Sequence, residues 1–395
     1  GGEGCGGGLG FGGFGGGGCG VSRLFEPTHR RGLQRSQSHF LSFFSICSLI
    51  YLGGALFSAS ATTLSSVWFS PTPESDDLAD VFEHPEAWKE ARNHIDTIVF
   101  NAGQLVSHRP DQGPSLLDGL VKADAFRRVT QWGLKTAIAV PALKEWDCDA
   151  KQTPKISLRM MKSVVEHGGK VDAIEMDEPL VSALGLNQPI CHLEVDAAAR
   201  RIAAYGEALM SAPLTIRTGA HLEMVDIEAY PSIKVEQIED WIDALQRHQF
   251  RISALHLDVS LGQVAARPDG WSRLVPDLQR LQRFLRTRNV LFGIIIWSGY
   301  DPLRHDRDYY SRALDWAGTI HQALGQPDRL IFNSWVTRCA PVGACKGGDF
   351  GCTIAGADSL CGRHSVPHNL PESGKDVFSH TRLVLDTLRL FSSDR

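Results

Sequence analysis

The sequence lacks a concentrated basic stretch and a glycine-rich phosphate loop. Its 395 residues carry 40 Lys and Arg against 45 Asp and Glu, and the basic residues are scattered along the chain. A nucleic-acid groove needs basic side chains gathered on one face, so we expect no nucleic-acid partner. The turn Asn101-Ala102-Gly103-Gln104 does not have the G-x-G-x-x-G spacing of a dinucleotide-binding loop. We therefore expect no bound cofactor.

The common metal-ligand motifs are also missing. No H-x-H or H-E-x-x-H pattern occurs, and the cysteines are not spaced as C-x-x-C pairs. We expect no metal, although His364 and His368 near the last cysteines leave a zinc site open as an alternative.

The cysteines instead indicate disulfides. Cys5, Cys19 and Cys47 lie in segments that we expect to be removed, and six cysteines remain. An even number of cysteines in an exported chain predicts disulfides, here three, without fixing how they pair. Four of the six fall in one glycine-rich stretch, which predicts a disulfide-stapled loop after the last strand. The six are Cys148, Cys191, Cys339, Cys345, Cys352 and Cys361.

The amino-terminal region indicates export. Residues 1–32 are rich in glycine and of low complexity, so they cannot form a packed core. Residues 33–61 carry a basic flank, an apolar run at 40–57 and the small residues Ala59-Ser60-Ala61, which together predict a secretory signal peptide cleaved near Thr62. An uncleaved membrane anchor is the alternative. The first methionine is Met160, so we expect that residue 1 is not the natural start.

After a lead-in at 62–92, short apolar runs alternate with longer amphipathic segments. Such alternation predicts βαβ units and a parallel sheet. We expect helices at 157–167, 195–211, 235–248, 273–288, 308–324 and 378–391. We expect strands at 96–101, 135–141, 171–177, 214–218, 224–229, 252–259, 290–297 and 330–335. Eight units over about 240 residues fit a closed (β/α)8 barrel, or TIM barrel, of α/β class that occupies residues 93–395.

Polar residues lie where these strands end, which is the catalytic face of such a barrel. Asp177 and Glu178 follow the third strand, and Asp226 and Glu228 lie on the fifth. Clustered acids raise the pKa of one carboxyl group, which suits a general acid. Asp258 shares a strand face with His256 on the sixth strand.

Aromatic residues fall at the same strand ends. Their planes can stack on the apolar faces of sugar rings, while amides and carboxylates bind the hydroxyl groups. Carbohydrate is therefore the expected substrate. The residues predicted to bind it are Asn101, Tyr230, His256, Trp297, Tyr300, Asn333 and Trp335.

From about residue 93 to 391 the chain resembles the glycoside-hydrolase-type barrel superfamily. The segment Asp172-x-x-Glu175-x-Asp177-Glu178 is similar to the D-x-x-D-x-D-x-E strand of chitinase-type barrels, with the final Glu one residue early. The slip moves that Glu to the other strand face. The seventh strand ends in Trp297, where the largest clan of retaining barrels carries a Glu. The resemblance implies the superfamily and no single family within it.

These features predict a secreted glycosidase that uses two carboxyl groups and acts as a monomer on an oligo- or polysaccharide. Glu178 is the predicted general acid and Glu228 the nucleophile or base. Asp177 tunes Glu178, and Asp258 is a reserve for either role. One alternative is a non-catalytic carbohydrate-binding barrel. Another is a metal-dependent hydrolase that uses Asp177, His256 and Asp258.

Overall fold

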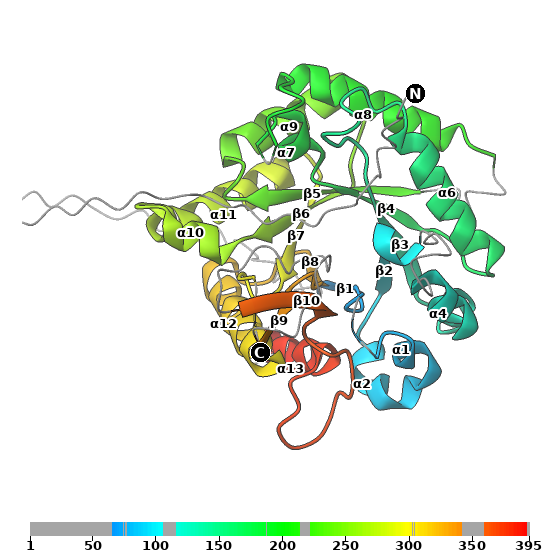
Figure 1. Cartoon of the computed structure of the whole chain (residues 1–395). Coiled ribbons are helices and arrows are strands. Elements are labelled where there is room, and N and C mark those ends of the chain that lie inside the picture. Colours follow the sequence, from blue (N-terminus) through cyan, green and yellow to red (C-terminus); the bar gives the residue numbers. More distant parts are fainter. Residues whose placement is uncertain are drawn as a thin grey trace, which may run out of the picture. The chain divides into compact units, whose positions relative to one another are not determined.

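Eight parallel strands form a closed barrel in the computed structural model (Figure 1). The structure describes residues 65–73, 75, 77–105, 116–186, 188–213, 222–301, 303, 305–341 and 359–392, without the side chains of 337–341 and 359–364. The strands follow chain order around the ring, and the last pairs with the first. They are β1 (Ser66–Phe69), β2 (Thr97–Asn101), β3 (Lys135–Val140), β4 (Ala173–Asp177), β5 (Glu223–Tyr230), β6 (Ala254–Val259), β7 (Leu291–Ile296) and β8 (Arg329–Phe332).

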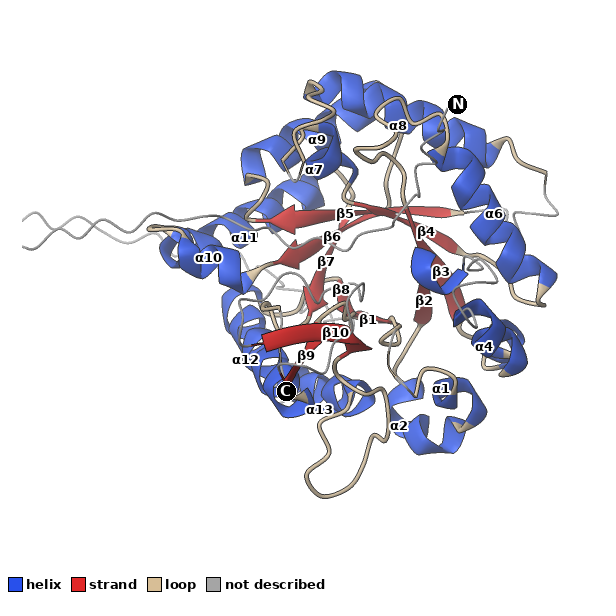
Figure 2. Cartoon of the chain, in the orientation of Figure 1, coloured by secondary structure: helices blue, strands red, loops and turns tan. Residues whose placement is uncertain are grey.

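Helices connect the strands and surround the ring (Figure 2). The longer helices bury one apolar stripe against the strands, as the spacing of their apolar residues predicts. A small antiparallel sheet of β9 (Thr337–Pro341) and β10 (Ser359–Ser365) follows the barrel. The helices are α1 (Asp80–Glu83), η1 (Pro85–Trp88), α2 (Lys89–Arg92), α3 (Ala102–Leu105), α4 (Leu116–Lys122), α5 (Ala125–Gln131), α6 (Thr153–Glu166), α7 (Pro179–Ala183), α8 (Val195–Met210), α9 (Val235–Arg247), α10 (Leu261–Ala266), α11 (Gly270–Thr287), α12 (Asp306–Leu324) and α13 (His380–Ser392).

The TIM-barrel prediction is confirmed, with one change in the strand set. Seven predicted strands correspond to β2 through β8, while the predicted strand at 214–218 lies outside the described residues. The ring is completed by β1, which pairs with both β2 and β8. The barrel therefore begins at Ser66, within the stretch predicted as a lead-in, rather than at residue 93. This strand was not predicted from the sequence.

Strand register decides which side chains face the barrel interior. Trp68 of β1 lies 4.9 Å from the His256 ring of β6, measured between centroids, so both point inward. Residues paired in register across parallel strands face the same side. Moving two residues along a strand also keeps the same side. Following the paired residues from strand to strand in this way places Asp177 and Asp258 inward as well. The opposite faces of these strands pack against helices.

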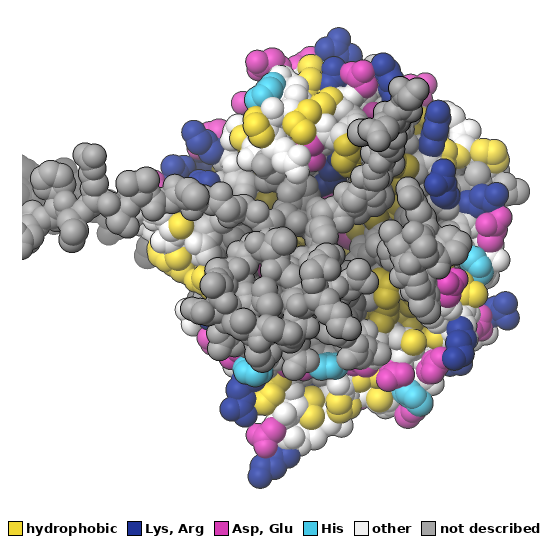
Figure 3. Space-filling view, viewed as in Figure 1, with side chains coloured by type: hydrophobic (Ala, Val, Ile, Leu, Met, Phe, Trp, Pro, Cys, Tyr) yellow, Lys and Arg dark blue, Asp and Glu magenta, His cyan; other side chains and the backbone are white. Residues whose placement is uncertain are grey.

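The predicted signal segment and the glycine-rich residues before it lie outside the described part of the chain. Within the described part, no helix is long and apolar enough to cross a membrane. On the face drawn in Figure 3, the described Lys and Arg side chains are spread around the outer edge of the view and do not form one patch.

Candidate active site

The carboxyl end of β4 brings two predicted acids to the barrel mouth. Asp177 is the last residue of β4 and lies on its inward face. Glu178 follows in the left-handed backbone region, at φ 48° and ψ 50°, and Pro179 then begins α7. The Glu178 N–H donates a hydrogen bond to the carbonyl of Ile227 at 3.0 Å, and this bond holds the unfavourable backbone conformation of Glu178. The chain thus turns within one residue and leaves both acids at the rim.

Lys144 also lies at the barrel mouth, although it was not predicted from the sequence as a site residue. It lies in the loop after β3, is 5% exposed, and its Nζ is 2.7 Å from Oδ2 of Asp177. Burial alone would lower the pKa of Lys144, but the carboxylates of Asp177 and Glu178 outweigh burial and raise it. Lys144 lies three residues after Pro141, where another predicted strand ends, and this position could have identified it from the sequence.

Asp258 lies on the inward face of β6, which is separated from β4 by β5. Burial raises the pKa of its carboxyl group well above the ordinary value, and the negative charges of Glu178 and Asp177 raise it further. The indole of the nearby Trp297 offsets only part of this rise. The result is a buried carboxyl group with a raised pKa at the same end of the barrel as Asp177, which has the Lys144 ammonium as its counter-ion.

Two tryptophans lie together at the ends of β7 and β8. The rings of Trp297 and Trp335 are 4.7 Å apart between centroids, at an angle of 39°. Trp297 is 3% exposed, whereas Trp335 is 37% exposed. The pair therefore has one buried ring and one partly exposed ring.

Glu228 has a different environment from the one that the sequence suggested. It lies on the outward face of β5 and is fully buried. Its two carboxyl oxygens accept the N–H groups of Leu180 and Val181 at 2.8 and 3.3 Å, which caps the first turn of α7. Burial, the charge of Asp226 and that of Glu178 raise its pKa well above the ordinary value. We therefore do not carry Glu228 forward as the nucleophile.

Asp226 and Tyr230 of β5 also face outward. Asp226 is buried, accepts a hydrogen bond from Trp241 Nε1 of α9 at 2.7 Å, and has a pKa raised to about 8 by burial. The Tyr230 hydroxyl donates to Asp277 Oδ2 of α11 at 2.9 Å. Tyr230 thus packs between the strand and its helices rather than at the mouth, and its predicted contact with sugar is not supported.

His256 and Glu175 form a buried pair inside the barrel, below the mouth. His256 Nδ1 lies 2.6 Å from Glu175 Oε1, and the two residues are 0% and 1% exposed. A Cβ added to Gly293 would lie 2.4 Å from His256 Cδ2, so the ring rests directly on the backbone of β7. His256 is therefore part of the barrel filling, and we do not retain it as a sugar ligand.

The remaining predicted sugar ligands have mixed surroundings. Asn101 Oδ1 accepts the N–H of Gln104 at 3.2 Å within its own turn. The Tyr300 ring is covered by the guanidinium of Arg312, 4.8 Å from its centroid, on α12. Asn333 is partly exposed at the end of β8, next to the tryptophan pair in sequence. Binding of sugar by these three residues stays a prediction.

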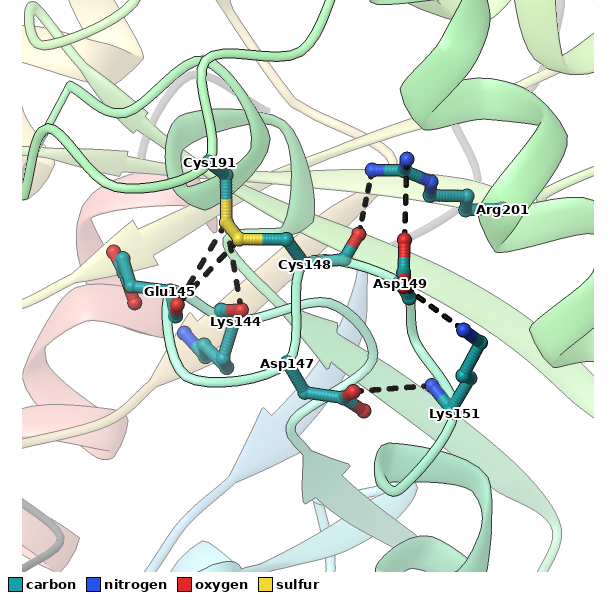
Figure 4. The surroundings of a disulfide bond; sticks show 8 residues. All are labelled: Lys144, Glu145, Asp147, Cys148, Asp149, Lys151, Cys191 and Arg201. Atoms are coloured by element: carbon teal, nitrogen blue, oxygen red, sulfur yellow. Dashed lines mark hydrogen bonds and ion pairs between the residues drawn. A yellow bond between two sulfur atoms is a disulfide. The ribbon is translucent and has the colours of Figure 1, made fainter.

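One disulfide joins two loops at the mouth (Figure 4). Cys148, in the loop that carries Lys144, is bonded to Cys191, in the loop between α7 and α8. Both cysteines were among the six predicted to form disulfides, whose pairing the sequence left open. Cys339 and Cys361 occupy opposite positions in the register of β9 and β10, but their side chains are not described. Cys345 and Cys352 lie outside the described residues, so the stapled loop after the last strand stays a prediction.

Among the described residues, those at the barrel mouth do not form a cluster that could hold a metal ion. Among the described residues, the group of three possible ligands that could share one ion is Asp80, Glu83 and His84, on and after α1 and largely exposed. Asp177, His256 and Asp258 are not such a group. The metal-dependent alternative therefore gains no support from the described mouth.

No protein-family model matches the chain, and no curated protein matches its sequence. Among solved structures, the chain is similar to a glucosidase from Croceicoccus marinus, with a TM-score of 0.39 and 13% sequence identity. The match covers 68% of this chain and 59% of the length of that glucosidase. A similarity of this extent assigns no function, which rests instead on the residues of the mouth.

Proposed function

We propose that this chain is a glycoside hydrolase of the TIM-barrel type that acts on an oligo- or polysaccharide. Asp258 is the general acid, and Glu178 is the carboxylate that serves as nucleophile or base. The observation that carries this proposal is the asymmetry of the acids at the mouth. Asp258 is buried and has a raised pKa, while Asp177 beside Glu178 is paired with the buried ammonium of Lys144.

Glycoside hydrolysis needs this division of labour between two carboxyl groups. The acid protonates the leaving glycosidic oxygen as its bond to the anomeric carbon breaks. The carboxylate attacks that carbon or activates a water molecule. The partial exposure of Trp335 supports the proposal, because a tryptophan that solvent can reach at the end of β8 could stack on a sugar ring. Asp258, predicted as a reserve, thereby takes the acid role first given to Glu178.

The test is hydrolysis of a panel of polysaccharides and aryl glycosides by the purified chain and two variants. Glu178→Gln should lower kcat by about 10²–10⁴-fold, as expected for loss of a catalytic acid–base group. Glu228→Gln should retain activity. Its amide nitrogen cannot accept a backbone N–H, so it should lower the free energy of unfolding by about 1–3 kcal/mol.

Two results would reject parts of this proposal. Equal loss of activity in both variants with unchanged stability would return Glu228 to the mechanism. Sugar binding by the wild-type chain without cleavage of any substrate would favour the non-catalytic carbohydrate-binding barrel.

We also propose that the enzyme is exported. The Cys148–Cys191 disulfide supports this, because disulfides persist mainly in oxidising compartments. Sequencing the amino terminus of the mature protein should place the first residue near Thr62. A mature chain that still contains residues 40–57 would contradict cleavage and favour the membrane anchor.

A further inference from the structure

Trp146 lies at the tip of a tight turn at the barrel mouth. The turn runs from Lys144 to Asp147, whose N–H donates a hydrogen bond to the Lys144 carbonyl at 2.8 Å. Lys144 begins the turn, and its Nζ lies 2.7 Å from Oδ2 of Asp177. Trp146 is 40% exposed, whereas Glu145 beside it is buried. The turn therefore presents a tryptophan to solvent two residues from a side chain that pairs with an acid of the mouth.

A second loop with exposed apolar side chains is bonded to this turn. Cys148 follows the turn and forms the disulfide with Cys191, in the loop between α7 and α8 (Figure 4). Ile190, directly before Cys191, is 57% exposed, and Leu186 of the same loop is 43% exposed. Single exposed apolar side chains are common, but a group of them on joined loops indicates a binding surface.

The turn that carries Trp146 is held in place by its own contacts. Oδ2 of Asp147 accepts the N–H of Thr153, the first residue of α6, at 2.8 Å. Arg201 of α8 donates from Nη1 to the carbonyl of Cys148 at 2.7 Å. The disulfide adds a covalent link to the second loop. A surface that is ordered before binding loses less conformational entropy when a ligand binds.

The order of the strands places the mouth acids between two exposed tryptophans. Trp146 follows β3, and Trp335 follows β8. Between β3 and β8 in the ring come β4 and β6, which carry Asp177 and Asp258 on their inward faces. A ligand that reaches from one tryptophan to the other on this side of the ring therefore crosses the strand ends that carry the acids.

We propose that the two disulfide-linked loops form a carbohydrate subsite in which Trp146 stacks on a sugar ring. The substrate is then a chain held on both sides of the bond to be cut. This inference rests on the proposed function and deepens it, because it assigns a binding surface and a minimum length to the substrate. The surface continues into the acid-bearing mouth through Lys144, and this continuity favours a sugar chain over a protein partner.

The test compares Trp146→Ala with the wild-type chain on aryl monoglycosides and on cello-, laminari-, xylo- and chito-oligosaccharides of increasing length. KM for the longer chains should rise about 10-fold with kcat nearly unchanged. Stacking far from the scissile bond contributes equally to the ground and transition states, and about 1.4 kcal/mol corresponds to a factor of ten. The change should be smallest for the monoglycosides. Trp146→Phe, which keeps an aromatic ring, should restore most of the affinity.

Trp271→Ala is the matched control. Trp271 is 53% exposed, but it lies on α11 in the helical layer around the ring (Figure 1). This variant should leave KM unchanged for every chain length. Ile190→Ser on the second loop should give a smaller loss of the same kind, and it tests the subsite if Trp146→Ala does not fold.

A measurement without catalysis separates the subsite from the proposed function. The same oligosaccharides, immobilised as an array, should bind Trp146→Ala about 10-fold more weakly than the wild-type chain. Equal binding by the two, an equal loss in Trp271→Ala, or no binding of any of these sugars by the wild-type chain would overturn the inference. A wild-type chain that binds sugar through Trp146 but hydrolyses nothing would support the subsite and reject the proposed hydrolase.

Discussion

Replacing Asp258 with Asn should lower kcat by about 10²–10⁴-fold, the range expected when a general acid is removed. Asn has the shape of a protonated Asp, which is the form that burial and the neighbouring acids favour here. The free energy of unfolding should therefore stay close to that of the wild-type chain. Hydrolysis of a substrate with a poor leaving group, measured beside chemical denaturation, checks both expectations.

The matched control is Asp226→Asn. Asp226 is also a buried acid with a raised pKa, of about 8, and it lies on the neighbouring strand. It faces outward and bonds to Trp241 on α9, so it should be irrelevant to catalysis. An Asp226→Asn variant as inactive as Asp258→Asn would show that any change to a buried acid harms the barrel, and Asp258 would lose its assigned role.

Replacing His256 with Leu should lower the free energy of unfolding by about 3–5 kcal/mol. The change removes the partner 2.6 Å from Glu175 Oε1 and leaves that carboxyl group in the barrel interior with an apolar neighbour. Removing one member of a buried pair costs more than the pair contributes, because the remaining group loses both water and its partner. Equilibrium unfolding in urea measures the change.

The double variant Glu175→Leu with His256→Leu provides the check on this reasoning. With both polar groups gone, much of the stability should return, since apolar replacement of a whole buried pair is often close to neutral. A single variant within about 1 kcal/mol of wild type would show that the pair contributes little, because surface-like changes are of that size.

The buried pair and the mouth acids belong to the same two strands. Glu175 and Asp177 are two residues apart on β4, and His256 and Asp258 are two residues apart on β6. A contact between the lower residues therefore constrains the height and spacing of the upper ones. This arrangement links the packing of the barrel interior to the geometry of the proposed acid and carboxylate.

The positions of seven strands could be predicted because parallel strands buried on both faces form short, continuous apolar runs. Because both faces of β5 are buried, however, the sequence did not indicate which face of β5 points inward. Residues 226–229 alternate between acids and apolar groups, and both faces are buried, so the alternation does not reveal which one faces the barrel interior. Asp226, Glu228 and Tyr230 share one face of the strand, and that face meets helices.

The amino-acid order by itself determined the barrel, most of its strands, the acids at the end of β4 and a set of six candidate disulfide cysteines, two of which the structure joins. These are properties of local spacing and residue type. Only the tertiary structure decided that Asp258 is buried on the inward face of β6, that Glu228 caps a helix, and that Lys144 pairs with Asp177. Ion pairing and burial depend on groups brought together from different strands, and no local pattern in the chain records those distances.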